Sequence, residues 1–325
     1  MKKVLFATTA LVASAGVASA QGVEVSGWAE MGIFGGDGIE TQFFTDIDVL
    51  FRMSGETDNG LSFGAGVDLD ENGAFSINDD GGAFMFLSGN FGTITMGDTD
   101  GALDWALTEA WVGNAGSIAD DETAHAGALG AYGDGAYDGQ ILRYDNTFGD
   151  FGVAVSVEMD DLGLRDNGFA VGFRYGMDLG GADVNFGVGY QTFTAAAGYL
   201  PGNLDSAFIG PFAGGEDVTI VGISADVSTN GFSAGLQYSV WDNDTTVDFT
   251  QLGLGVGYTS GAFTVSANYG QYDGDVAGFW DVDGFGLAAA YDLGGGASIN
   301  AGYGSSQYFG GPSMDTFSLG VAMSF

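Results

Sequence analysis

The last eleven residues, Asp315 to Phe325, read D-T-F-S-L-G-V-A-M-S-F and alternate between two kinds of side chain. One set is large and apolar: Phe317, Leu319, Val321, Met323 and Phe325. The residues between them are small or polar. Because a β-strand projects successive side chains to opposite faces, this segment forms a strand with one apolar face and one polar face. The same alternation recurs along the chain and predicts an all-β protein, a transmembrane β-barrel.

The alternation predicts sixteen strands in antiparallel order. Their expected ranges are 23–34, 43–56, 61–70, 82–89, 92–98, 140–147, 151–159, 168–177, 184–192, 218–228, 232–241, 248–259, 262–272, 283–292, 298–305 and 315–325.

Short and long connections alternate between these strands. Seven short turns carry Gly, Asn and Asp, which favour tight turns. Eight long connections are expected near 35–42, 71–81, 99–139, 160–167, 193–217, 242–247, 273–282 and 306–314. A sixteen-stranded barrel with both termini in the periplasm needs seven periplasmic turns and eight longer outer loops.

The N-terminus has the features of a secretory signal. Met1-Lys2-Lys3 is basic, Val4 to Val17 is mostly apolar, and Ala18-Ser19-Ala20 is a cleavage site of the A-x-A type. We therefore expect residues 1–20 to be a signal peptide and residues 21–325 to form the barrel. The chain has no cysteine, so neither a lipoprotein anchor nor a disulfide is available.

The chain is strongly acidic, with a formal net charge of −37 at pH 7. Beyond the signal, its basic residues are four arginines: Arg52, Arg143, Arg165 and Arg174. Such a chain repels nucleic acid and attracts cations. A disordered acidic protein is excluded, because 46% of the residues are hydrophobic and 14% are aromatic. The 60 glycines fall mostly on polar strand faces, where they leave room for a channel or for a loop folded inside.

The segment 99–139 is the longest stretch without strand alternation. Loops of this length are usually functional, and this one is long enough to fold into the barrel and narrow it. Within it, residues 104–112 are expected to form a short helical turn. Its acidic residues include Asp100, Asp104, Glu109, Asp120, Asp121, Glu122, Asp134 and Asp138, and it holds the single histidine, His125.

Several stretches together resemble the general diffusion porins of Gram-negative bacteria, most closely the Rhodobacter type. The matching stretches are Val23 to Gly27, Val49 to Ala65, Phe86 to Asp98, Leu142 to Asn146, Tyr291 to Ile299 and the terminal Phe325. The resemblance implies a homotrimer in the outer membrane, in contact with lipid and lipopolysaccharide. It also implies a third loop folded inward as a constriction, passive diffusion of small hydrophilic solutes, and Phe325 as a signal for the barrel-insertion machinery.

The strand faces indicate which charged residues line the lumen. Arg52 shares a face with Asp46 and Asp48, Arg143 with Asp145, and Arg174 with two glycines. Because an arginine facing lipid at mid-depth costs about 2–4 kcal/mol, the lumen is the expected side. There the arginines either line the constriction or simply pair with neighbouring carboxylates.

One departure from the family's pattern concerns the second strand. Asp46 and Asp48 stand where porins of this type tend to carry arginine, so we expect a wall with less positive charge and a cation-selective channel. The acids of segment 99–139 are expected to add to this preference at the constriction: Asp100, Asp104, Glu109, Asp120, Asp121 and Glu122.

The sequence also offers candidate metal ligands but no catalytic constellation. Acidic pairs in the loops offer hard oxygen ligands for Ca²⁺, with Asp79, Asp80, Asp242 and Asp244 as candidates, but no cofactor is required. His125 has no positioned nucleophile nearby in the sequence, so no enzyme is expected.

Three alternatives remain open at this stage. A substrate-preferring channel on the same fold would use the loop 193–217, with Tyr199, Phe208 and Phe212. A surface adhesin or structural barrel would have a plugged, non-conducting lumen. A salt-adapted soluble protein would be recovered without detergent.

Overall fold

The computed structural model describes residues 22–72, 82–134, 140–160, 163–201, 212, 214–244, 248–275 and 281–325, with the backbone alone at 70–72. The expected signal peptide lies outside the described residues. The described chain forms a closed barrel in which each strand pairs with its neighbours in sequence and β1 pairs with β16. All pairs are antiparallel, so the predicted sixteen-stranded barrel is confirmed.

The strands are longer than expected by a residue or two at many ends. They are β1 (Gly22–Gly36), β2 (Ile39–Glu56), β3 (Ser62–Asn72), β4 (Ala83–Gly89), β5 (Gly92–Asp98), β6 (Gln140–Phe148), β7 (Phe151–Glu158), β8 (Gly168–Asp178), β9 (Asp183–Thr194), β10 (Asp217–Thr229), β11 (Phe232–Asn243), β12 (Phe249–Ser260), β13 (Phe263–Gly274), β14 (Val282–Gly294), β15 (Ala297–Tyr308) and β16 (Ser313–Ser324).

The two faces of β16 differ as the alternation predicts. Leu319 is 49% exposed on the outside, whereas the adjacent Ser318 is 3% exposed on the inside. The barrel closes through this strand, which pairs with β1 along its length. The main chain of Phe325 extends the closure, because its N–H donates to Gly27 O (2.9 Å) and its carbonyl accepts from Gly27 N (3.3 Å).

The first outer connection is much shorter than the predicted 35–42. β1 and β2 are joined by Asp37 and Gly38 alone. Gly38 has a φ of +75°, which suits a two-residue hairpin turn and lets both strands continue to it. The last outer connection also shrinks, from 306–314 to residues 309–312, as β15 and β16 extend.

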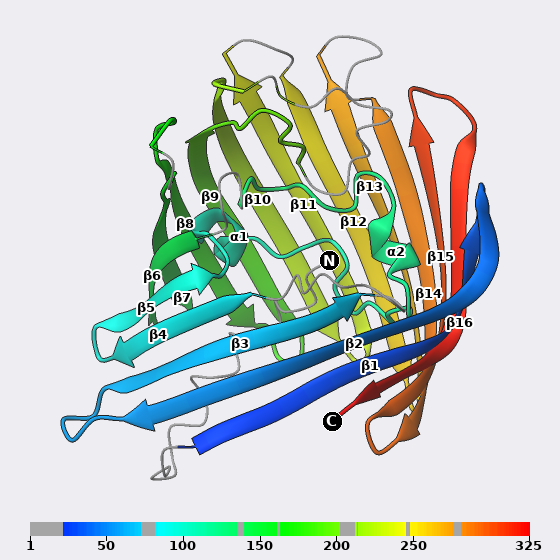
Figure 1. The fold of residues 1–325 in the computed structure, drawn as a ribbon, viewed down its shortest axis with the longest axis horizontal. Coiled ribbons are helices and arrows are strands. Elements are labelled where there is room, and N and C mark those ends of the chain that lie inside the picture. The colour runs from blue at the N-terminus through cyan, green and yellow to red at the C-terminus, as the bar shows by residue number, and fades with distance from the viewer. Residues whose placement is uncertain are drawn as a thin grey trace.

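The long connection between β5 and β6, residues 99–139, is called loop 3 below. Figure 1 shows its described part inside the barrel, between the strongly inclined β1–β3 and the wall of β8–β15. Loop 3 contains two short helices, α1 (Ala102–Ala106) and α2 (Asp121–Ala124). The expected helical turn at 104–112 therefore begins earlier and ends sooner, and α2 was not predicted. Neither helix is long and apolar enough to cross a membrane.

Candidate permeation site

Loop 3 follows the inner wall twice. On the first pass it meets wall glycines in the pairs Ala102–Gly172, Leu107–Gly222, Gly113–Gly257 and Ile118–Gly320. On its return the pairs are Asp121–Gly304, Glu122–Gly286, His125–Gly284 and Gly127–Gly270. These glycines lie on strands from β8 round to β16. On β3, by contrast, Gly64 and Gly66 meet the rings of Phe86 and Phe84 from β4. Loop 3 thus covers one side of the barrel.

The wall glycines decide how closely the loop approaches. A Cβ added at Gly255 would overlap the Ala110 carbonyl, and one at Gly172 would overlap that of Ala102. Because these glycines lack side chains, the loop backbone lies directly on the wall backbone. The sequence left open whether these glycines leave room for a channel or for a loop folded inside. In the structure, loop 3 occupies the space beside them.

Side chains of the wall bind the backbone of loop 3. Four wall serines accept loop N–H groups, in the pairs Ala102–Ser156 (2.8 Å), Thr108–Ser224 (2.8 Å), Ala115–Ser266 (2.9 Å) and Ala126–Ser306 (2.9 Å). Wall donors meet loop carbonyls in the pairs Gln251–Gly127 (3.0 Å), Tyr272–Leu129 (2.7 Å), Trp241–Gly130 (3.2 Å) and Asn300–Gly116 (3.0 Å). Buried backbone groups need such partners, so these residues fix the loop's path.

Two of the predicted wall arginines hold the start of loop 3. Arg143 on β6 is only 4% exposed, donates to Asp100 O (2.7 Å) and bonds the carboxylate of Asp145 (3.2 Å). Its guanidinium is also 3.7 Å from the carboxylate of Asp100. Arg174 on β8 stacks on Trp105, 3.8 Å from the ring centre. The two arginines therefore lie together at the start of loop 3.

The predicted loop acids mostly face the wall or the loop itself. Asp121 and Glu122 are each 1% exposed. Glu122 accepts from Asn114 Nδ2 (2.9 Å), and Asp121 lies within hydrogen-bond reach of Ser117 Oγ (3.4 Å). Burial raises the pKa of both carboxyl groups. Asp120 remains partly exposed, with a left-handed φ of 53°.

His125 is also part of this contact with the wall. It is 3% exposed and its Nε2 hydrogen-bonds the side chain of Asn268 on β13. Burial lowers its pKa. The residue therefore anchors the return pass of the loop.

A separate acidic patch lies on the inner face of β1, β2 and β3. Asp46 is directly opposite Glu30, and Asp48 is opposite Trp28. We call Glu30, Asp46, Asp48 and Asp68 the acidic wall. The expectation from the sequence included Asp46 and Asp48 but missed Glu30 and Asp68, although the alternation of β1 and β3 places both on the inner face.

Arg52 lies on the same side of the barrel. It is partly buried on β2, in register with Glu24 and Gly66. The three arginines expected to line the lumen are thus split, with two under the loop and Arg52 beside the acidic wall.

The expected calcium ligands can be placed only in part. Asp242 and Asp244 are exposed near the end of β11, where Asp244 Oδ1 accepts from Asp217 N (3.1 Å). Asp79, Asp80 and Asp138 lie outside the described residues. Within the described ranges, no group of three or more His, Cys, Asp or Glu side chains is arranged to hold a metal ion. Calcium binding stays a prediction.

The long connection after β9 contains aromatic residues expected to bias solutes. Tyr199 and Phe212 pack against each other with ring centres 5.9 Å apart, and Tyr199 meets Phe193 edge-on at 5.4 Å. Phe212 is 3% exposed. These rings form a packed cluster, while Phe208 lies outside the described part of the chain.

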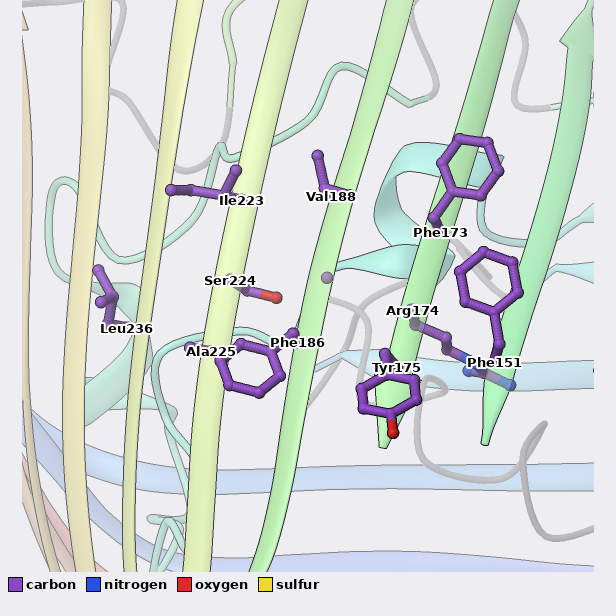
Figure 2. Close-up of a pocket in the computed structure, with 11 residues that line it drawn as sticks. Phe151, Phe173, Arg174, Tyr175, Phe186, Val188, Ile223, Ser224, Ala225 and Leu236 are labelled. Carbon is purple, nitrogen blue, oxygen red and sulfur yellow. The ribbon is translucent and has the colours of Figure 1, made fainter. Parts of the chain in front are cut away.

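A hollow of about 340 Å³ lies over β7–β11. Figure 2 shows Phe151, Phe173, Tyr175 and Phe186 around it. These side chains are 38–45% exposed and belong to the apolar outer set of their strands. The hollow is therefore part of the outer apolar surface and not of the lumen.

A closed barrel narrowed from inside by one long loop has the form of a diffusion channel. The chain matches the family model for Gram-negative porins over residues 7–310. The chain belongs to the Gram-negative porin family. A porin from Rhodobacter capsulatus is 31% identical over 296 residues, covering 86% of this chain and 93% of the relative.

Solved porin structures have the same barrel. A porin structure refined at 1.8 Å is 25% identical, with a TM-score of 0.65, and covers 94% of this chain and 100% of that one. A triple mutant of Rhodopseudomonas blastica porin is 21% identical, with a TM-score of 0.63 and the same coverage, and shows the shared fold. As a porin, the chain forms a channel across the outer membrane and belongs to a family of channels rather than enzymes.

Proposed function

We propose that this porin is a cation-preferring channel for small hydrophilic solutes, and that the acidic wall sets the preference. The observation that supports this most is the register of β1 and β2, which puts Glu30 directly opposite Asp46 on the inner face. Like charges in directly opposed strand positions destabilise a sheet. We attribute the presence of these opposed carboxylates in the channel wall to a role in attracting cations.

The local charge balance supports the same conclusion. Between Gly22 and Asp98 the sequence contains one basic residue, Arg52. Carboxylates in a narrow passage with low-dielectric walls raise the local concentration of cations. Most loop acids are buried against the barrel or bonded within the loop, and Glu30 is itself only 3% exposed. We therefore infer that the partly exposed Asp46 and Asp48 are the main source of negative charge facing the passage.

The test replaces both Asp46 and Asp48 with arginine. The reversal potential of single channels in a KCl gradient is expected to move from cation toward anion preference. A matched control replaces Asp58 and Asp150, which are exposed in short turns, with arginine and changes the net charge equally. An anion-selective native channel, or equal shifts in both variants, would contradict the proposal. The native preference should weaken at high salt, because the Debye length falls to about 3 Å at 1 M.

We further propose the assembly that the family resemblance implies. Three copies associate in the outer membrane, in contact with lipid and lipopolysaccharide, and the barrel-insertion machinery recognises the C-terminal Phe325. Channel function requires neither a cofactor nor enzymatic activity. Nucleic acid is not a partner, since the chain carries a formal charge of −37.

A further inference from the structure

The two ends of loop 3 meet over β6–β9. Asp134, near the end of the loop, accepts hydrogen bonds from Gly101 N (2.6 Å) and from Gln191 Nε2 on β9 (2.7 Å). Gly133 N donates to the same glutamine side chain at Oε1 (2.9 Å). One carboxylate thus ties the start of the loop, its end and the wall together.

A second contact closes the same region. Tyr132 OH donates to Glu109 Oε1 (2.6 Å), joining the end of the loop to the residue three positions after α1. Asp104, within α1, is 8% exposed beside them. We call Asp104, Glu109, Tyr132 and Asp134 the loop seam.

The loop seam carries more acid than base. The charged or titratable groups that interact with it are Asp100 on the loop, Arg143 on β6, Glu158 on β7 and Tyr199 after β9. Next to Arg143 lie Asp145 on β6 and Arg174 on β8. Arg143 already binds Asp100 and Asp145, and Arg174 stacks on Trp105. Full ionisation of the seam would therefore leave several buried negative charges close together, which is costly.

Protonation relieves this cost. Burial raises the pKa of Glu109 to about 7 and that of Asp134 to about 6, and it raises the pKa of Asp104 well above its usual range. Between the ordinary carboxyl pKa and these raised values, the docked loop holds more protons than an undocked loop does. By linkage, docking is strongest at low pH and weakens as the pH rises through this window.

We propose that Glu109 and Asp134 are positioning residues for the constriction, and that the loop seam holds loop 3 in place while Asp104 and Glu109 are protonated and loosens as these two ionise. The inference rests on loop 3 forming the constriction of the proposed channel. It does not require cation preference, because its test measures the dependence of loop motion on pH. Each proposal can therefore fail without the other.

The test records current fluctuations in single open channels between pH 5 and pH 9. KCl at about 1 M keeps surface charges screened. Current fluctuations of the native channel should increase with pH. The midpoint of this increase should fall near the raised pKa values of the seam carboxyl groups. Glu109→Gln keeps an acceptor for Tyr132 but cannot become charged, so its fluctuations should increase with pH much less than those of the native channel. Glu40→Gln, an exposed position at the start of β2, is the matched control and should behave like the native channel.

Hydrogen exchange gives an independent measurement. The amide of Gly101 donates to Asp134, and the amide of Gly133 donates to Gln191, whose side chain itself donates to Asp134. The exchange of both amides, corrected for intrinsic rates, should accelerate as the pH rises, by about tenfold for each pKa unit by which a seam carboxyl group is shifted. In Glu109→Gln this acceleration should be smaller. Asp134→Asn cannot accept from both donors in the same way and should fluctuate at every pH. A native channel with no pH response, or a Glu109→Gln variant that follows the native curve, would overturn the proposal.

Discussion

At the scale of single residues, Gly255 shows how the wall sets the position of the constriction. The carbonyl of Ala110 occupies the space that a side chain at Gly255 would fill. The barrel can accommodate a larger residue only if the loop moves, since the wall strand is held by hydrogen bonds on both sides.

We expect Gly255→Val to change single-channel conductance while the barrel still assembles. Overpacking of this kind costs about 1–3 kcal/mol, which should appear as a lower unfolding temperature of the folded protein. Gly176→Ala is the control, because its added Cβ meets only the flexible Asn185 side chain (2.9 Å). Unchanged conductance in Gly255→Val would mean that the loop position does not depend on this contact.

Residue roles were only partly predictable from the sequence. Alternation placed Arg52, Arg143 and Arg174 on inner faces, because a period of two is independent of distant structure. It could not show that Arg143 and Arg174 lie under loop 3. The burial of Asp121 and Glu122 was equally hidden, since it depends on where a loop without periodicity meets strands far away in sequence.

At the scale of elements, β4 and β5 are unusually short. Each has seven residues, whereas β12 has twelve. A strand of seven residues extends about 23 Å, and a tilt of about 45° leaves about 16 Å along the membrane normal, less than the apolar band of about 25 Å. Lipid alone therefore matches this hairpin poorly, and we expect a neighbouring subunit to cover it.

Cross-linking tests this subunit contact. Met85 on β4 is 59% exposed and Val256 on β12 is 55% exposed, so the two are matched in accessibility. With Met85→Cys, a short thiol-specific cross-linker should give covalent dimers and trimers on a denaturing gel. Val256→Cys should give only the monomer band on the same gel. The native chain has no cysteine to react. Cross-linking at Val256 but not at Met85 would place the contact on the other side of the barrel.

The elements themselves were the most predictable level. All sixteen strands were identified because each carries its own alternation and most turns carry Gly, Asn or Asp. The errors lie where local signals are weak. The turn at Asp37–Gly38 was hidden because both flanking strands run on through glycines and polar residues, and α2 has four residues, too few to show a helical period.

At the scale of the whole molecule, the barrel depends on closure between the first and last strands. The backbone of Phe325 continues the pairing of β16 with β1, while its side chain is 78% exposed. Backbone and ring can therefore be tested separately.

Deletion of Phe325 should reduce the yield of membrane-inserted protein, and Phe325→Ala should do the same if the ring is recognised during insertion. The alanine variant keeps both main-chain hydrogen bonds to Gly27, each worth about 0.5–1.5 kcal/mol, whereas the deletion loses them. Heat-modifiable mobility on gels of isolated outer membranes measures the folded fraction. Normal yields from both variants would exclude a role for Phe325 in assembly, and a defect in the deletion alone would assign the role to the backbone.

The glycines under loop 3 also limit how the channel can change over evolution. Glycine is the smallest residue, so every substitution at these wall positions adds atoms between wall and loop. The displaced loop has only the lumen to move into. Single substitutions at these glycines can therefore make the passage narrower but not wider. A lineage that needs to admit larger solutes must shorten the loop or alter the opposite wall.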